Sequence, residues 1–80
     1  MLLDVVTVKP LDGYLLSLEF ENGEERRFDM GPYMNERPFN RLKDANLFFA
    51  AKVEFGTVVW PGNIDIAPET LYDLSVSVNQ

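Results

Sequence analysis

The sequence of 80 residues contains no cysteine and no histidine. Without cysteine, no disulfide can constrain the fold and no thiolate can ligate zinc or attack a substrate. Without histidine, the chain lacks the commonest general base and the commonest metal ligand. Histidine-based catalytic triads and ordinary zinc sites are therefore excluded. We expect a non-enzymatic protein with no catalytic residue, no metal ion and no cofactor.

Long apolar runs are also missing. No stretch approaches the roughly 18 consecutive apolar residues that a membrane helix needs. The first residues carry no basic segment, and Asp4 interrupts their apolar run, so they do not match a signal peptide. We therefore expect a cytoplasmic protein with no membrane partner. Positive charge is scarce as well, because seven basic residues stand against 13 acidic ones and give a net charge of −6. Phosphate backbones repel such a chain, so we expect no direct contact with nucleic acid.

The residues that are present fit one folded domain, which we expect to span residues 1–80. Apolar residues make up 46% of the chain and charged residues 25%, which is ordinary for globular proteins. Six phenylalanines, three tyrosines and one tryptophan supply the bulk of a hydrophobic core, so we do not expect disorder. A chain of this length is enough for one core and not for two.

The first third of the chain alternates apolar and polar residues as strands do. Residues 14–21 are the clearest case, because every second residue from Tyr14 to Phe20 is apolar. The pair Asn22-Gly23 favours a type I′ hairpin turn, which needs a positive φ at both central residues. We predict strands over residues 3–9, 14–21 and 24–30, which form a three-stranded antiparallel meander with one face in water.

Two or three short helices are predicted in the rest of the chain. The first covers residues 37–43 and has Pro38 in its first turn, where a missing N–H is harmless. Residues 47–49 form an apolar plug of about one helical turn. Pro68 begins another helix over residues 68–73, with an acidic residue in the first turn where the helix dipole favours it.

A second hairpin is predicted over residues 51–60, turning around Phe55-Gly56. The tail, residues 75–80, is short and we expect it to fray. The expected fold class is α+β: a small antiparallel sheet, made of the N-terminal three-strand meander plus this second hairpin, with two or three short helices.

Acidic side chains are the first candidates for a site. Asp29 and Asp65 stand out because each lies at a strand end beside turn residues. Carboxylates can hold Mg²⁺ or Ca²⁺ or act as an acid–base pair. Carboxylates at strand ends also serve as turn caps or simply face water. The scattered spacing of the acidic residues favours these simpler roles.

A basic strip is the second candidate. It consists of Arg26, Arg27, Arg37, Arg41 and Lys43. On a helix surface, Arg37 and Arg41 lie four residues apart and both face water, where they can bind phosphate or an acidic partner. The alternative is a solvated helix face with Glu36 and Asp44 as local counter-ions.

Trp60 lies at a strand end before the turn residues Pro61, Gly62 and Asn63. Tryptophan is enriched in binding hot spots, but a lone tryptophan in a small domain is more often the largest group of the core. The edges of an open sheet are a further candidate, because they invite strand addition by a partner or by a second copy.

Several segments together resemble the bacterial domain-of-unknown-function family 2442. The matching segments are residues 5–10 (VVTVKP), 14–24 (YLLSLEFENGE), 27–29 (RFD), 42–44 (LKD) leading to Phe48, and 58–72 (VVWPGNIDIAPETLY). The resemblance covers nearly the whole chain, and the last segment is the most specific part.

The resemblance implies a small α+β fold in a bacterial, cytoplasmic setting, and it implies no established activity. Some relatives resemble members of toxin–antitoxin-like gene pairs, which implies a regulatory role exerted through a partner protein. The family pattern marks Trp60, Asp65, Leu71 and Tyr72.

We therefore predict a non-catalytic protein-interaction or regulatory module, antitoxin-like in one form, that binds a partner protein or itself. The candidate binding surface comprises Trp60, Asn63, Asp65, Tyr72, Arg37 and Arg41. The alternative is a small ligand- or metal-binding domain or enzyme that uses Asp65 together with an arginine of residues 37–43.

Overall fold

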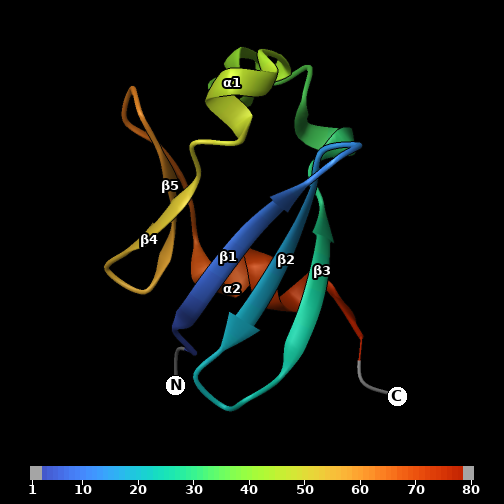
Figure 1. The fold of residues 1–80 in the computed structure, drawn as a ribbon, viewed down its shortest axis with the longest axis vertical. Helices are drawn as coiled ribbons and strands as arrows, with labels where there is room; N and C mark the ends of the chain where they lie inside the picture. Colours follow the sequence, from blue (N-terminus) through green and yellow to red (C-terminus); the bar gives the residue numbers. More distant parts are fainter. Residues whose placement is uncertain (1–2, 79–80) are drawn as a thin grey trace.

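The structure is a computed structural model that describes residues 3–78. It contains two antiparallel sheets and several short helices (Figure 1). The first sheet has the strand order β1-β2-β3-β7, formed by β1 (Val5–Leu11), β2 (Leu15–Phe20), β3 (Glu25–Asp29) and β7 (Val76–Ser77). The second has the order β4-β5-β6, formed by β4 (Lys52–Glu54), β5 (Thr57–Trp60) and β6 (Ile64–Ile66). The predicted α+β class is confirmed.

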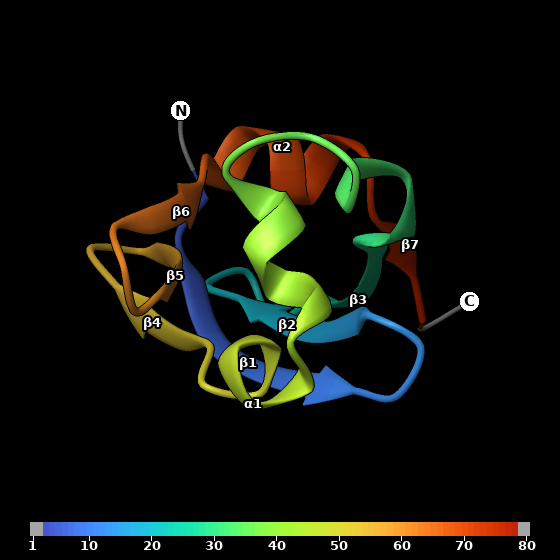
Figure 2. The same ribbon diagram turned by 90° about the horizontal axis from the view of Figure 1, so that it is seen from above.

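The helices cover one face and one end of the first sheet. They are the 3₁₀ helices η1 (Gly31–Tyr33) and η2 (Phe39–Lys43) and the α-helices α1 (Ala45–Phe48) and α2 (Pro68–Asp73). Helix α2 lies behind the first sheet in Figure 1 and across from it in Figure 2, while η2 and α1 lie at the upper end of the molecule. The opposite face of the first sheet is left without a covering layer (Figure 2).

The predicted meander is confirmed, and its alternation sets the core face. Leu16, Leu18 and Phe20 of β2 are buried, with at most 1% of each residue exposed. The register places Leu16 opposite Phe28 of β3, so both strands bury the same face. Burial of these apolar side chains is the main stabilising contribution of the sheet.

The first hairpin turn differs from expectation. Gly23 has φ +85° and donates its N–H to the Phe20 carbonyl at 2.9 Å, whereas Asn22 does not have a positive φ. The loop is therefore a three-residue hairpin with glycine in the left-handed region, and the predicted type I′ turn is wrong. The reason is local, because the Asn22 side chain accepts the N–H of Glu24 at 3.0 Å and forms an Asx turn.

The second hairpin turns around Phe55 and Gly56, so this prediction is confirmed. The type I′ geometry occurs here, because Phe55 has φ +53° and Gly56 has φ +75°. Glu54 pairs with Thr57, so these two residues form the whole loop. This turn also contacts the first sheet, because the N–H of Val5 donates to the Gly56 carbonyl at 2.8 Å. The start of β1, which is an edge strand of the first sheet, is therefore partly covered.

The predicted fraying of residues 75–80 is wrong for the residues that the structure describes, while residues 79 and 80 lie outside them. Strand β7 pairs with β3, with Val76 opposite Arg27, and the N–H of Val78 donates to the Glu25 carbonyl at 2.9 Å. The segment is held because Arg26 donates to both the hydroxyl and the carbonyl of Ser75, at 2.6 and 2.9 Å.

The predicted helix over residues 37–43 is a 3₁₀ helix that begins after Pro38 and buries Leu42. It ends at Asp44, whose side chain accepts the N–H of Asn46 at 3.0 Å and caps α1. One aspartate thus ends the first helix and begins the second. The predicted helices at residues 47–49 and 68–73 correspond to α1 and α2.

The core lies where the two sheets, α1 and α2 meet. Its buried apolar residues are Val5, Leu16, Leu18, Phe20, Phe28, Met30, Met34, Leu42, Phe48, Val58, Trp60, Ile64, Ile66 and Leu71. The Trp60 indole N–H donates to the Phe48 carbonyl at 3.0 Å, and the two rings stack with centroids 6.4 Å apart. Among the described residues, no helix combines the length and the apolar composition needed to cross a membrane.

We predict that Gly56→Ala destabilises the fold more than Gly13→Ala does. Both glycines have a positive φ, but a Cβ at residue 56 would lie 2.5 Å from the Asp4 carboxylate, whereas one at residue 13 meets nothing within 4 Å. Gly13→Ala should cost about 1 kcal/mol, and Gly56→Ala on the order of 1 kcal/mol more because Asp4 must move. Urea unfolding measures both. Equal losses of unfolding free energy in the two variants would contradict the close approach of Gly56 to Asp4. In an Asp4→Ala background, the difference between the two variants should become smaller.

Candidate functional site

A shallow pocket lies on the outer face of the second sheet. We call it the β4–β6 pocket. It encloses about 430 Å³ and is lined by Lys52, Glu54, Phe55, Val59, Trp60, Pro61, Gly62, Asn63, Ile64 and Asp65. Small-molecule pockets commonly span about 300–1,000 Å³, so this volume lies at the lower end of that range and also suits a long side chain.

The register of the second sheet places the pocket's side chains. Lys52 pairs with Val59, and Val59 pairs with Asp65, so these three residues form one row across the outer face. Residues directly opposite one another share a face of an antiparallel sheet. The neighbouring residue Val58 points the other way and is fully buried. The pocket is therefore the solvent side of a sheet whose other side is core.

The turn between β5 and β6 closes one end of the pocket. Gly62 and Asn63 have φ values of +90° and +62°, which glycine and asparagine tolerate better than other residues. Arg41 of η2 donates to the Gly62 carbonyl at 3.0 Å and braces this turn from outside. Three residues of the predicted binding surface, Trp60, Asn63 and Asp65, therefore line this pocket. Arg41, a fourth, contacts the turn at its end.

The charges at the pocket are only partly compensated. The Lys52 ammonium lies 3.0 Å from the Glu54 carboxylate. The only other ion pair between described residues joins Arg26 to Glu24, so Asp65 has no ion-pair partner within residues 3–78. The pocket therefore presents one uncompensated carboxylate beside a neutralised pair.

Phe55 is the most unusual residue of the pocket. It is 97% exposed and has φ +53°. A bulky residue in the left-handed region is strained, and at this exposure the ring contributes almost no burial that would offset the strain. Sequence reasoning overlooked Phe55, although a phenylalanine at a turn position that favours asparagine or glycine was a usable signal. Lys52 and Val59 were overlooked because only the register places them here.

Trp60 is 2% exposed, and its N–H is bonded within the core. Of the two roles proposed for it, the structure places it as a core residue. Arg37 is exposed and does not line the pocket. Tyr72 lies on α2, in a different polar cluster.

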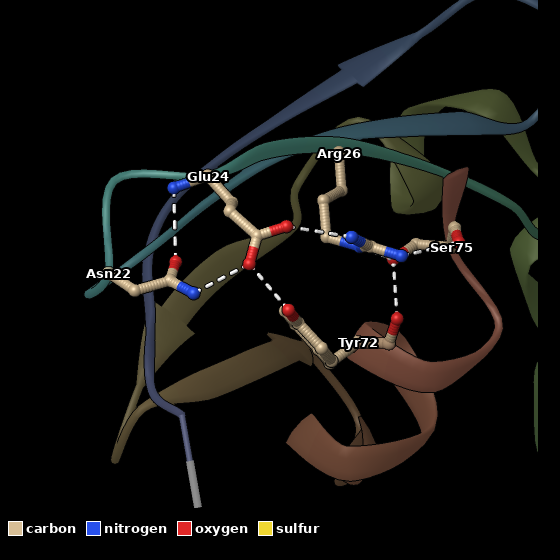
Figure 3. Close-up of polar contacts among 5 residues, drawn as sticks. All are labelled: Asn22, Glu24, Arg26, Tyr72 and Ser75. Carbon is tan, nitrogen blue, oxygen red and sulfur yellow. Dashed lines mark hydrogen bonds and ion pairs between the residues drawn. The ribbon is translucent and has the colours of Figure 1, made fainter. Parts of the chain in front are cut away.

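That cluster joins the C-terminal segment to β3 (Figure 3). The Glu24 carboxylate accepts hydrogen bonds from the Tyr72 hydroxyl, from Asn22 at 2.6 Å and from Arg26 at 2.8 Å. The Arg26 guanidinium also lies 4.4 Å from the centre of the Tyr72 ring and donates to Ser75. These five residues, which we call the polar clamp, satisfy one another and hold the fold together.

The polar clamp shifts two pKa values. The hydrogen bond from Tyr72, followed by that from Asn22, lowers the pKa of Glu24 below its ordinary value. The same bond to the Glu24 carboxylate is the main cause that raises the pKa of Tyr72. Both shifts have one cause. The hydrogen bond from the Tyr72 hydroxyl stabilises the ionised carboxylate of Glu24 and the protonated hydroxyl of Tyr72.

The predicted basic strip is dispersed. Arg26 belongs to the polar clamp, and Lys43 donates to the Asn35 side chain at 2.8 Å. Arg41 braces the β5–β6 turn. Arg37, Arg41 and Lys43 are all exposed, which agrees with the alternative of a solvated face. Neither Glu36 nor Asp44 forms a close ion pair with another described residue, and Asp44 caps α1.

The two aspartates singled out from the sequence lie on different sheets. Asp29 accepts the N–H of Gly31 at 2.8 Å, which is a turn cap. Asp65 lies on β6 at the pocket. Within residues 3–78, no group of three or more acidic side chains lies close enough together to hold a metal ion.

Comparison with known proteins identifies one family. The model of the family described as "Protein of unknown function (DUF2442)" matches residues 5–77, which is nearly the whole chain. No curated protein and no solved structure matches the chain.

We predict that Glu24 gives the fold an acid-sensitive component of stability. Its pKa is lowered in the folded state, so the unfolded state takes up the proton first as the pH falls. This stability is present above the ordinary pKa near 4.5 and is lost below it, as the pH passes through the lower folded pKa. Glu24→Gln should flatten the decrease in melting temperature between about pH 5 and pH 3.

The control is Glu36→Gln, which removes an exposed carboxylate outside the polar clamp. Tyr72→Phe should also flatten the decrease, because it removes the largest cause of the lowered pKa and so brings the folded-state pKa of Glu24 back toward its unfolded value. If the melting temperatures of wild type and Glu24→Gln decrease equally between about pH 5 and pH 3, Glu24 is not the source of the acid-sensitive stability.

Proposed function

We propose that this chain, which belongs to the DUF2442 family of proteins of unknown function, is a non-catalytic interaction module that binds a partner protein through the β4–β6 pocket. Phe55 is the anchor of the contact. The pocket supplies the surrounding contact surface. The negative net charge of the chain attracts a basic partner and speeds association.

The exposed, strained Phe55 is the observation that supports this proposal. A phenylalanine ring that is 97% exposed does not stabilise its own core, and its φ of +53° is unfavourable for a bulky residue. Strained residues cluster at sites of function. Burial of one aromatic ring against a partner is worth roughly 1.5–3 kcal/mol, which compensates for the strain.

The surroundings of Phe55 suit a docking surface. A sheet face with an apolar centre and charged neighbours resembles the core and rim of a protein interface. The net charge of −6 favours fast association with a basic partner. An antitoxin-like regulator that neutralises a basic protein in the bacterial cytoplasm is one form of this function, and self-association is another.

A small-molecule site is the second candidate, because a pocket does lie next to Asp65. The side chains of Lys52 and Glu54 are 63% and 45% exposed, so water screens the charges of the pocket. Electrostatic catalysis depends on a water-excluded site, so binding is favoured over chemistry. Of the two arginines that the enzyme hypothesis could use, Arg41 donates a hydrogen bond to the Gly62 carbonyl and Arg37 does not line the pocket.

We predict that Phe55→Asn makes the fold more stable and abolishes partner binding. Asparagine tolerates the left-handed region, so relief of strain should raise the free energy of unfolding by about 1 kcal/mol, or the melting temperature by roughly 4–8 °C. Thermal unfolding followed by circular dichroism measures this change. A lower melting temperature would show that the ring supports the fold.

Binding is measured by affinity capture from the source cells with wild type, Phe55→Asn and Leu74→Asn as baits. Leu74 is the matched control, since it is 59% exposed at the end of α2, outside the pocket. A protein retained by wild type and Leu74→Asn but lost with Phe55→Asn supports the proposal. Recovery of identical proteins with all three baits overturns it. A metabolite that stabilises wild type and Phe55→Asn equally would favour the second candidate instead.

A further inference from the structure

The uncompensated charge of the β4–β6 pocket is negative. Two carboxylates, Glu54 and Asp65, and one ammonium, Lys52, line it. Lys52 is paired with Glu54 at 3.0 Å, and Asp65 has no ion-pair partner among residues 3–78. An exposed carboxylate favours a cationic partner group and repels phosphate and acidic peptides.

The second feature of the pocket is an aromatic ring with its faces open. Phe55 is 97% exposed, so a flat cation can approach the ring. Guanidinium groups stack on aromatic faces with a cation–π attraction. The two-residue turn fixes the backbone of Phe55 relative to the sheet, and Phe55 is one of the residues that line the pocket.

The third feature is an aliphatic floor. Val59 lies between Lys52 and Asp65 in the row across the sheet and is half-buried. The methylene groups of a long cationic side chain pack against apolar surface while the charged head reaches a polar group. The volume of about 430 Å³ is large enough for such a side chain and a few neighbouring backbone atoms.

We infer that the β4–β6 pocket receives an arginine side chain from a cationic, extended segment of the partner protein. The guanidinium stacks on Phe55 and bonds to the Asp65 carboxylate, and its methylene groups cover Val59. Arginine fits better than lysine because its planar head stacks and forms paired hydrogen bonds with a carboxylate. This inference rests on the proposed interaction function and names its partner class.

The test is a titration of the ¹⁵N-labelled protein with acetylated hexa-arginine amide, followed by NMR. Amide shifts should concentrate in β4, β5 and β6. Hexalysine amide should bind at least about threefold more weakly, because lysine lacks the planar head. Asp65→Asn should weaken hexa-arginine binding about fivefold, and Phe55→Asn should weaken it too.

Asp12→Asn is the matched control for Asp65→Asn. Asp12 is exposed on the β1–β2 turn, which lies far from the second sheet in both views of the ribbon (Figures 1 and 2). It changes the net charge equally and should weaken binding less than about twofold. Equal effects of the two variants, or shifts spread over the four-stranded sheet, would mean diffuse charge attraction and would overturn the inference.

The inference and the proposed function can fail separately. If a captured partner depends on Phe55 but tolerates Asp65→Asn and high salt, the partner's contact is not cationic and the inference is wrong while the function stands. If hexa-arginine binds at the pocket but no captured protein depends on Phe55, the site chemistry stands and the interaction function is wrong.

Discussion

The bond between the Trp60 indole and the Phe48 carbonyl is the contact on which the rest of the molecule depends. The second sheet has only three strands of three or four residues each, and its inner face packs into the core shared with the first sheet. Phe48 is fully buried, stacks on Trp60 and meets the edge of Tyr14 from the β1–β2 turn at 5.3 Å. One helical turn thus joins both sheets into one core. In a chain without disulfides, this shared core makes the outer face of the second sheet rigid enough to present a site.

The polar clamp also joins distant parts of the chain, because it connects the β2–β3 turn and β3 to the C-terminal segment. Glu24 and Tyr72 are 48 residues apart in sequence, and Arg26 reaches Ser75 across 49. Contacts this far apart in sequence close long loops, whose conformational entropy the rest of the fold must offset. The clamp uses all the residues of Figure 3 to hold one another, which explains why Tyr72 belongs to the fold, whereas Asp65 is exposed at a surface.

What could be predicted from the sequence was local, and what could not was decided by distant contacts. Alternation from Tyr14 to Phe20 predicts a half-buried strand because period two is a property of the backbone. The paired C-terminal strand could not be foreseen, because Arg26 and Ser75 meet only in the folded chain. At the site, Asn63 and Asp65 were identified by their turn and strand positions. Phe55 was placed in the second hairpin turn but not identified as a binding residue, because its exposure of 97% is a property of the folded chain.

The second hairpin separates two demands on adjacent residues. Gly56 approaches Asp4 too closely to accept a side chain, and its carbonyl is bonded to Val5. The ring of Phe55, one position earlier, projects into water. The fold therefore constrains the backbone of this turn but does not depend on the side chain of Phe55. Antibody binding loops are likewise carried by a β-sandwich whose stability does not depend on their side chains. Residue 55 is thus a natural place to graft another recognition group, and small tolerant domains with one such position are convenient starting points for engineered binders.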